Sequence, residues 1–426
     1  MTNMICLVLS LLLLAFATTA TADTTHDINE TPTSPIILVP GDGGSALEMR
    51  INGTKSSVPH FFCERTTRGR WKRVWFSPSV LSPGYVDCWA DNIRLRYTSK
   101  VDGTSSVSNA PGVEIQAVKG KDGLTVLKGV SSSNVYKALL DRFGDNIDAK
   151  PYDFRLSPTG NPAFVTDLKR MVEDTYERTG GARKVTLVSH SLGCLMVHSF
   201  FIKTVDTAWR DKYIHAWIPI SPAIGGAPYD LLQIITGDPT SFKWVNPKDL
   251  RDEQRSFESS LWLMPDPHLY PNSVRTNNHY DDGFDGVIVQ SRLFNYTTSD
   301  YNRLFADIGF SDGPIVYDRV KNLTEWADSD RAELQDPGVA VYPIYGNNQE
   351  TTIKFIYGDV KKGPIDKVTT MNGDNTVPRR SLETCNGFAR SFSPLVVDGK
   401  GHLDVLTDET VLDHIQAIVE SEAVET

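Results

Sequence analysis

Beyond its first 22 residues the sequence has no hydrophobic run that could cross a membrane, and it has no excess of positive charge. A membrane-spanning helix needs about 20 consecutive apolar residues, and no later stretch reaches that length. The formal net charge is −10, which argues against a general nucleic-acid binder because phosphates are neutralised by a basic face. With 40% hydrophobic and 23% charged residues, the composition is that of an ordinary globular protein.

Cysteine is also scarce, and one of the 5 cysteines lies in an N-terminal apolar run, Ile5–Ala17. That run precedes Ala20-Thr21-Ala22, so we predict a cleaved signal peptide over residues 1–22 and a lysosomal or secreted protein. A retained anchor is the alternative because Met1–Met4 contain no Lys or Arg, but the run is too short to span a bilayer comfortably. In an oxidising compartment pairing of the remaining cysteines is expected. The same route fits four predicted glycosylation sites, Asn29, Asn52, Asn295 and Asn322.

The order of apolar segments predicts an α/β fold with a mostly parallel sheet covered on both faces. Residues 23–35 are rich in Thr, Asp and Pro and indicate an unpacked tail, and the buried strand PIILV with its glycine turn begins the domain. Further strands alternate with helical patterns. We expect these helices and strands at Pro162–Arg178, Leu192–Lys203, 183–188, 215–221 and 339–346. The predicted parts are core residues 36–228, an inserted cap at 229–335 and core residues 336–426.

The segment LVSHSLG, Leu187–Gly193, has the strand–turn–helix context of a nucleophile elbow. Strand and helix nearly touch at such a turn, so the positions two before and two after the nucleophile must be small. Ser189 and Gly193 meet this condition, although a serine replaces the usual first glycine. Ser191 is therefore the candidate nucleophile, whereas a strand ending in a serine-rich turn is the alternative.

A serine nucleophile needs a base, and the base needs an acid, in the chain order Ser, Asp or Glu, His. His402 follows a glycine-rich loop after an apolar strand, while His414 lies inside a helical pattern, so His402 is preferred. Asp374, in the turn NGDNTVP, is the candidate acid. Asp398 and Asp404 compete with it by proximity alone.

The chain resembles the family of lecithin:cholesterol acyltransferase and the lysosomal (group XV) phospholipase A2. The resemblance runs from about residue 36 to 416 and rests on VPGDGGSALE, VDCWADNIRLRY, PYDFR, HSLGCL, AWRDKYIHAWI, RDEQRSFESSLWLMP, RLFADIGFSDG, GDNTV and GHLDVL. It implies an α/β-hydrolase fold with a cap and a membrane-binding segment at about residues 50–100. It also places Ser191, Asp374 and His402 on the nucleophile, acid and base, with no metal and no cofactor.

The oxyanion hole needs two backbone N–H groups, one from Leu192 and one from the PGDGG turn. The resemblance places the second on Asp42, the residue type of the lysosomal phospholipase branch. An ionised carboxylate there would repel an oxyanion, so we expect activity to rise where Asp42 is protonated. The alternative is a turn aspartate that faces solvent.

The 24 residues between Cys63 and Cys88 carry five cations against two acids. Interleaved aromatics suit a contact with anionic lipid, and the candidates are Trp71, Trp75 and Phe76; a solvated loop whose aromatics fold inward is the alternative. The resemblance implies a Cys63–Cys88 disulfide, a free Cys194, and an unpaired Cys385 because Pro343 stands at its partner's position.

These observations predict a serine hydrolase that cleaves an acyl ester of a glycerophospholipid through an acyl-Ser191 intermediate. Water or a lipid alcohol would accept the acyl group at a phospholipid membrane or lipoprotein surface. A neutral-pH sterol acyltransferase and a catalytically silent lipid-binding protein are the alternatives. The acidic run HYDDGFDG from His279 lacks the ligand spacing of a known calcium loop.

Overall fold

The computed structural model describes residues 33–76, 84–99, 104–128, 133–237, 246–272, 283–328, 331–361, 363 and 365–421. These residues belong to one compact unit, Thr33–Thr426. The predicted signal peptide, most of the predicted tail and the Asn29 site lie outside the described residues. No helix in the described ranges is both long and apolar enough to span a bilayer.

A six-stranded sheet forms the centre of this unit, and every strand pair in it is parallel. Its strands, in spatial order, are β17 (Leu395–Asp398), β14 (Ile344–Asn347), β9 (Ile214–Ile220), β8 (Val185–His190), β1 (Ile36–Val39) and β7 (Ile147–Ala149). The parallel sheet predicted from the alternating pattern is therefore confirmed.

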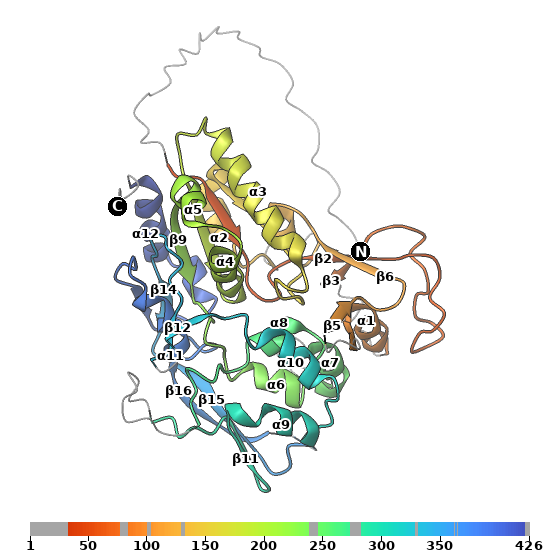
Figure 1. Ribbon diagram of the computed structural model, residues 1–426. Helices are drawn as coiled ribbons and strands as arrows, with labels where there is room; N and C mark the ends of the chain where they lie inside the picture. The colour runs from red at the N-terminus through yellow and green to blue at the C-terminus, as the bar shows by residue number, and fades with distance from the viewer. Residues whose placement is uncertain are drawn as a thin grey trace, which may run out of the picture. The chain divides into compact units, whose positions relative to one another are not determined.

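Side chains of β1 alternate between the two faces of the sheet, as the period of a strand requires. Ile37 and Val39 join one apolar cluster, and Ile36 and Leu38 join another. Helices cover both faces, and Figure 1 shows α3, α4 and α5 together on the first. The helices of the first face are α3 (Pro162–Arg178), α4 (Leu192–Lys203) and α5 (Thr207–Tyr213); those of the second are α2 (Lys137–Phe143) and α12 (Glu409–Glu420).

The bounds of α3 and α4 agree with the ranges predicted from the sequence. α3 starts with a proline in its first turn and buries Phe164, Leu168 and Val172, which are spaced four apart and share one helix face. Ten of the residues in α4 are buried, because this helix runs directly from the sheet into the interior.

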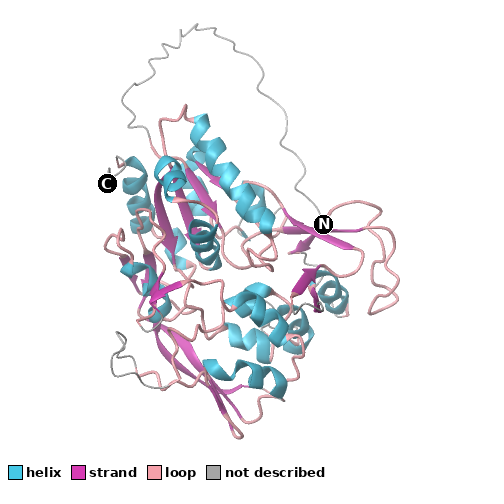
Figure 2. Cartoon of the chain, in the orientation of Figure 1, coloured by secondary structure: helices cyan, strands magenta, loops and turns pink. Residues whose placement is uncertain are grey.

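The chain between β9 and β14 forms short helices and part of a second sheet. Figure 2 shows these helices gathered beside a long hairpin. They are α6 (Asp230–Ile235), α7 (Pro247–Gln254), α8 (Glu258–Trp262), α9 (Tyr301–Asp307) and α10 (Gly313–Val320). The second sheet has the order β11 (Asn295–Tyr296), β10 (Val289–Ser291), β15 (Gln349–Tyr357) and β16 (Ile365–Gly373). β10 thus pairs with a strand beyond the predicted cap, whose boundaries stay a prediction.

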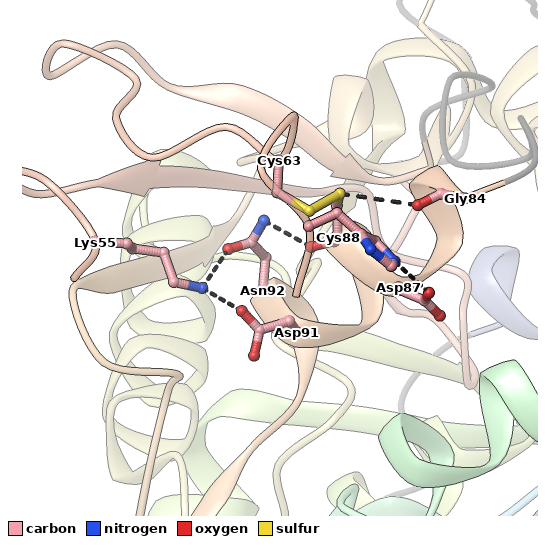
Figure 3. The surroundings of a disulfide bond; sticks show 8 residues. Lys55, Cys63, Gly84, Asp87, Cys88, Asp91 and Asn92 are labelled. Carbon is pink, nitrogen blue, oxygen red and sulfur yellow. Dashed lines mark hydrogen bonds and ion pairs between the residues drawn. A yellow bond between two sulfur atoms is a disulfide. The ribbon is translucent and has the colours of Figure 1, made fainter. Parts of the chain in front are cut away.

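A small sheet and one helix lie around the Cys63–Cys88 disulfide, whose predicted pairing is confirmed. Figure 3 shows Lys55 reaching Asp91 and Asn92 of the helix that carries Cys88. Lys55 Nζ lies 2.6 Å from Asp91 Oδ2, so an ion pair supports the same connection as the covalent link. The elements of this region are β3 (Lys72–Trp75), β2 (Leu47–Ile51), β6 (Val113–Ala117), α1 (Tyr85–Ile93) and the hairpin β4 (Arg96–Ser99) with β5 (Ser105–Ser108).

Candidate active site

The turn between β8 and α4 holds Ser191 in a backbone conformation that few residues other than glycine adopt. β8 is buried along its whole length and α4 starts at Leu192, so the chain reverses direction at Ser191 alone. Its φ is 53° and its ψ is −124°, values that strain a residue with a side chain. A strained serine between strand and helix is the geometry of a nucleophile elbow.

The neighbours of Ser191 are small because the surrounding backbone leaves no space. A Cβ added to Gly193 would lie 2.5 Å from the carbonyl oxygen of Val39, and one added to Gly41 would lie 2.8 Å from Cβ of Ser191. Ser189 fits because its hydroxyl accepts a hydrogen bond from Trp217 Nε1 at 2.8 Å and lies 3.2 Å from Cys194 Sγ. Ser189 is thus a satisfied interior hydroxyl.

His402 and Asp374 form a pair at the carboxyl end of the sheet. His402 Nδ1 lies 2.7 Å from Asp374 Oδ2, and the His402 backbone N–H donates to the Asp374 carbonyl oxygen at 2.7 Å. Two bonds between the same residues hold both the imidazole ring and its loop. His402 Nε2 is thereby left as the ring nitrogen that can exchange a proton with a neighbour.

The Asp374 carboxylate is fully buried and ionised. Burial alone would raise its pKa, but the charge of His402 and hydrogen bonds from His402, Val377 and Thr376 outweigh this effect and lower the pKa. Val377 N–H donates to Oδ1 at 2.7 Å and Thr376 N–H at 3.1 Å. The turn after β16 therefore fixes the carboxylate that orients the imidazole.

The competing residues have other partners. Asp398 accepts hydrogen bonds from Asn347 and Asn348 on an exposed surface, and Asp404 accepts from the Gly401 N–H at 3.1 Å. His414 lies on α12, within the helical pattern expected for it. The pair that the structure brings together is the one preferred from the sequence, while its catalytic roles stay a prediction.

A cavity of about 280 Å³ joins Ser191 and His402. Most of its wall is apolar, which suits part of an acyl chain. The wall also includes Tyr136 and His190, which sequence analysis missed: His190 stood unremarked inside LVSHSLG, and no local pattern marked Tyr136. The remaining lining residues are Asp42, Gly43, Gly44, Leu124, Val126, Ser133, Val135, Ala223, Ala227, Tyr229, Asp230, Gln233, Leu263, Thr376, Val377 and Leu403.

Two backbone N–H groups lie next to Ser191 and could face a developing oxyanion. Leu192 is the first residue of α4, and the N–H groups of a first helical turn have no acceptor within the helix. Asp42 follows Gly41, whose close approach to Ser191 brings the PGDGG turn against the nucleophile. Among the described residues nothing accepts a hydrogen bond from the Asp42 N–H. Both N–H groups are therefore available.

The Asp42 carboxyl lies on the cavity wall, where water can reach it. Desolvation by the neighbouring protein raises the pKa of Asp42 to about 7, while a hydrogen bond from the Gly43 backbone acts in the opposite direction. Because Asp42 is exposed on the cavity wall, water reduces this desolvation, and the net shift of the pKa is upward. Asp42 gains a proton at a pH where an ordinary aspartate stays ionised.

The three aromatic residues predicted to contact lipid differ in exposure. Trp71 is partly exposed, with Arg50 4.8 Å above its ring. Trp75 donates from Nε1 to the Gly43 carbonyl oxygen at 2.8 Å, beside the PGDGG turn, and Phe76 is buried in the core. These two side chains point inward because the turn and the core provide their contacts.

Sequence analysis missed the aromatic residues that are exposed in this region. Phe61 is 92% exposed and Phe62 is 40% exposed. The word HFFC, in which two adjacent phenylalanines precede a cysteine, was the signal for them. Elsewhere, the predicted glycosylation sites Asn52, Asn295 and Asn322 are exposed, and Cys194 and Cys385 are both buried and free.

A parallel sheet with a strained serine between β8 and α4, and a His–Asp pair beyond the later strands, defines an α/β-hydrolase. The fold agrees with a solved chain described as "The crystal structure of Tle4-Tli4 complex": the TM-score is 0.55 at 11% identity, over 91% of this chain and 97% of that chain. The family model described as "Lecithin:cholesterol acyltransferase" matches residues 71–398. The chain belongs to this family.

Relatives of known name are similar over most of the chain. The "Lysosomal phospholipase A and acyltransferase" of Homo sapiens is 29% identical, over 90% of this chain and 90% of the relative. The "Phosphatidylcholine-sterol acyltransferase" of Mus musculus is 30% identical, over 91% and 85%. The "Lecithin-cholesterol acyltransferase-like 1" of Arabidopsis thaliana is 33% identical, over 89% and 88%.

Proposed function

We propose that this protein is a serine hydrolase and acyltransferase that cleaves fatty acyl esters of glycerophospholipids through an acyl-Ser191 intermediate. The observation that carries the proposal is the His402–Asp374 pair, with His402 Nδ1 2.7 Å from Asp374 Oδ2, because His402 lines the same largely apolar cavity as the strained Ser191. Family membership and the names of the relatives support the same substrate class.

In the first half-reaction Ser191 Oγ attacks the ester carbonyl carbon while His402 Nε2 takes the serine proton. The carbonyl oxygen becomes an oxyanion that accepts hydrogen bonds from the N–H groups of Asp42 and Leu192. When the intermediate collapses, the bond to the lipid alkoxide breaks and His402 returns the proton to it. Asp374 keeps the imidazole in the required tautomer and stabilises its cation.

In the second half-reaction an acceptor hydroxyl gives its proton to His402 and attacks the acyl-serine carbonyl. The bond to Ser191 Oγ then breaks, and the serine recovers its proton. Water as the acceptor yields a free fatty acid, and a lipid alcohol yields a new ester. Hydrolysis and transacylation therefore follow from one intermediate.

The raised pKa of Asp42 favours an acid-active, lysosomal-type enzyme. A neutral carboxyl beside the oxyanion removes a repulsion that an ionised one would impose. The sterol acyltransferase alternative remains a second candidate because relatives named phosphatidylcholine-sterol acyltransferase match this chain at comparable identity. We infer a lysosomal or secreted location from these relatives and from the disulfide.

An exposed patch near the disulfide is the proposed contact with phospholipid membranes or lipoprotein surfaces, and we call it the lipid-facing patch. Its rings contact one another, with centroids 5.3 Å apart for Phe61 and Phe62 and 5.3 Å for Phe62 and Tyr85. Exposed aromatic rings and exposed arginines in one segment of the chain suit an anionic lipid surface. The patch consists of Phe61, Phe62, Tyr85, Arg65, Arg68 and Arg70.

The test measures fatty acid release and acyl-alcohol formation from anionic phospholipid liposomes that contain ceramide or sterol, at about pH 4.5 and about pH 7.4, on either side of the value near 7. We expect serine-dependent release with ceramide acylation in acid. Sterol ester at neutral pH would select the second candidate instead. Binding to liposomes without turnover, and without fluorophosphonate labelling of Ser191, would identify a silent lipid binder and reject the proposal.

A further inference from the structure

Two buried polar side chains, Tyr136 and His190, lie between the PGDGG turn and the loop that carries His402. Tyr136 immediately precedes α2 and is 1% exposed; His190 ends β8 and is 2% exposed. Both line the cavity beside Ser191, yet the mechanism above assigns neither a role. Buried polar atoms require hydrogen-bond partners, so their bonds show what they hold in place.

Three hydrogen bonds join the two loops through these side chains. The Gly41 backbone N–H donates to Tyr136 Oη at 2.7 Å, and Tyr136 Oη lies 3.1 Å from His190 Nδ1. His190 Nε2 lies 3.1 Å from the carbonyl oxygen of His402. This chain of hydrogen bonds therefore starts next to Asp42, a proposed oxyanion donor, and ends on the backbone of the proposed base.

The groups at the two ends of this chain of hydrogen bonds determine which atom is the donor in each bond. A carbonyl oxygen only accepts, so His190 Nε2 must carry the proton that it shares with His402. His190 Nδ1 is then an acceptor, and the Tyr136 hydroxyl donates to it while accepting from Gly41. A single tautomer satisfies all of these polar atoms, which makes the chain specific.

Packing holds His190 in this arrangement. Its ring centroid lies 4.8 Å from that of His402 and 5.7 Å from that of Tyr136. A Cβ on Gly41 would lie 3.0 Å from His190 Nδ1, so only glycine allows the approach. Burial, with a smaller contribution from the charge of His402, lowers the pKa of His190 to about 3. The ring is therefore neutral across the acid range in which the enzyme is proposed to act.

We propose that Tyr136 and His190 are positioning residues that couple the oxyanion turn to the loop of the catalytic base. The inference rests on the proposed function, because it concerns how the Asp42 N–H and His402 are held relative to Ser191. Oxyanion donors and a base act together only when both are placed in advance, and a small misplacement of either lowers the rate. A continuous series of hydrogen bonds fixes the distance between the Gly41 backbone and the His402 backbone while the rest of the cavity adapts to lipid.

The test compares Tyr136→Phe, His190→Gln and the double variant, with a short-chain p-nitrophenyl ester as substrate. Tyr152→Phe is the matched control: its hydroxyl is equally buried and donates to the Pro40 carbonyl oxygen at 3.0 Å, on the same turn, but it does not reach His190. We expect Tyr136→Phe to lower kcat about 10- to 100-fold, less than complete loss of an oxyanion donor, with KM within about 2-fold. Tyr152→Phe should keep kcat within about 3-fold.

Coupling predicts non-additivity, which a merely structural role does not. The double variant should lose about as much kcat as the more severe single variant, because either change breaks the same chain. His190→Gln combined with Tyr152→Phe should be additive. If Tyr136→Phe is too unstable to assay, the loss in kcat of His190→Gln relative to Tyr152→Phe decides alone.

The inference is overturned if Tyr136→Phe and Tyr152→Phe have the same kcat, or if the losses of Tyr136→Phe and His190→Gln add. Ser191→Ala, assayed alongside, separates the two proposals. An active Ser191→Ala protein would remove the proposed function itself. An inactive Ser191→Ala protein beside a fully active Tyr136→Phe protein would remove only the coupling.

Discussion

The turn around Ser191 and the lipid-facing patch are held in different ways. The backbone packs tightly around Ser191, and Gly41 and Gly193 lie too close to their neighbours to carry a side chain. The patch projects from a loop that a disulfide and an ion pair connect to α1, and it leaves Phe61 almost fully exposed. Ester chemistry requires fixed atoms, whereas a lipid surface requires exposed area. The two regions should therefore fail separately, in different assays.

The largest expected effect comes from Ser191→Ala, which acts on the catalytic turn alone. We expect kcat to fall about 10⁶-fold on both a soluble ester and liposomal phospholipid, as for other serine triads. Liposome binding, measured by flotation, should stay unchanged because the patch is intact. Residual turnover above the uncatalysed rate, insensitive to fluorophosphonate, would contradict a role for Ser191.

Asp374→Asn should lower kcat by about 10⁴-fold, because an amide in place of the carboxylate favours the wrong tautomer of His402. The loss should appear equally on soluble and liposomal substrate. Asp398→Asn is the matched control, since this exposed aspartate accepts hydrogen bonds from the side chains of Asn347 and Asn348 and lies outside the candidate site. Equal losses from the two variants would remove Asp374 from the site.

Replacing Phe61 and Phe62 by serine tests the other region. Each ring that enters a membrane gains about 1 kcal/mol or more from burial, so liposome affinity should drop about 10- to 100-fold. Activity on a soluble ester should stay within about 2-fold. Leu293→Ser is the control because this residue is 87% exposed but lies between β10 and β11. An equal loss in both variants would indicate general adhesion rather than a patch.

Asp42→Asn tests how the catalytic turn responds to pH. The Asp42 pKa is raised by desolvation, so its negative charge appears at a higher pH than that of an ordinary aspartate. Soluble-ester kcat of the wild type should fall by up to about 10-fold between about pH 6 and pH 8 relative to the variant, which stays neutral. Liposome affinity should not differ. An unmoved pH profile in the variant would refute the repulsion.

Glu253→Gln should give the smallest effect, on stability. Glu253 is 2% exposed, and its Oε2 has no hydrogen-bond partner among the described atoms. Burial, with repulsion from Asp42 and against attraction by Arg155, raises its pKa well above 4.5. In the unfolded state the Glu253 pKa is near 4.5, and in the native state it is raised. Between these two values the native state binds more protons than the unfolded state, so the free energy of unfolding falls as pH rises.

The glutamine variant is neutral at every pH, so this contribution to the pH slope disappears. We expect it to be more stable than the wild type by about 1 kcal/mol near pH 7, with the difference vanishing near pH 4.5. Urea denaturation at both pH values measures this. A difference that is the same at both values would contradict a protonated Glu253 in the native state.

Features with a local signature could be predicted from the sequence. A helical pattern that begins at Pro162 indicated α3, and small residues around Ser191 indicated the turn. The choice of Asp374 over Asp398 depends on where distant loops meet, and it came from chain order and the family resemblance. Tyr136 lies 54 residues from His190, and no local pattern records a contact at that separation.

The difference between Trp75 and Phe61 shows the same limit at the patch. Both are aromatic and lie within a few residues of cations, so composition does not tell which one faces solvent. Trp75 turns inward because the Gly43 carbonyl oxygen accepts its indole N–H. That acceptor belongs to a different segment, and only the tertiary structure brings it close.

The positive φ of Ser191 has a consequence for mutation and selection. Glycine adopts such a φ without the strain of about 1–3 kcal/mol that other residues bear. A Ser191→Gly protein would therefore lose its chemistry without losing stability, and proteases and chaperones, which respond to unfolding, would pass it as sound. Only selection on lipid turnover keeps a serine at this position, so a silent descendant of this fold lies a single codon change away.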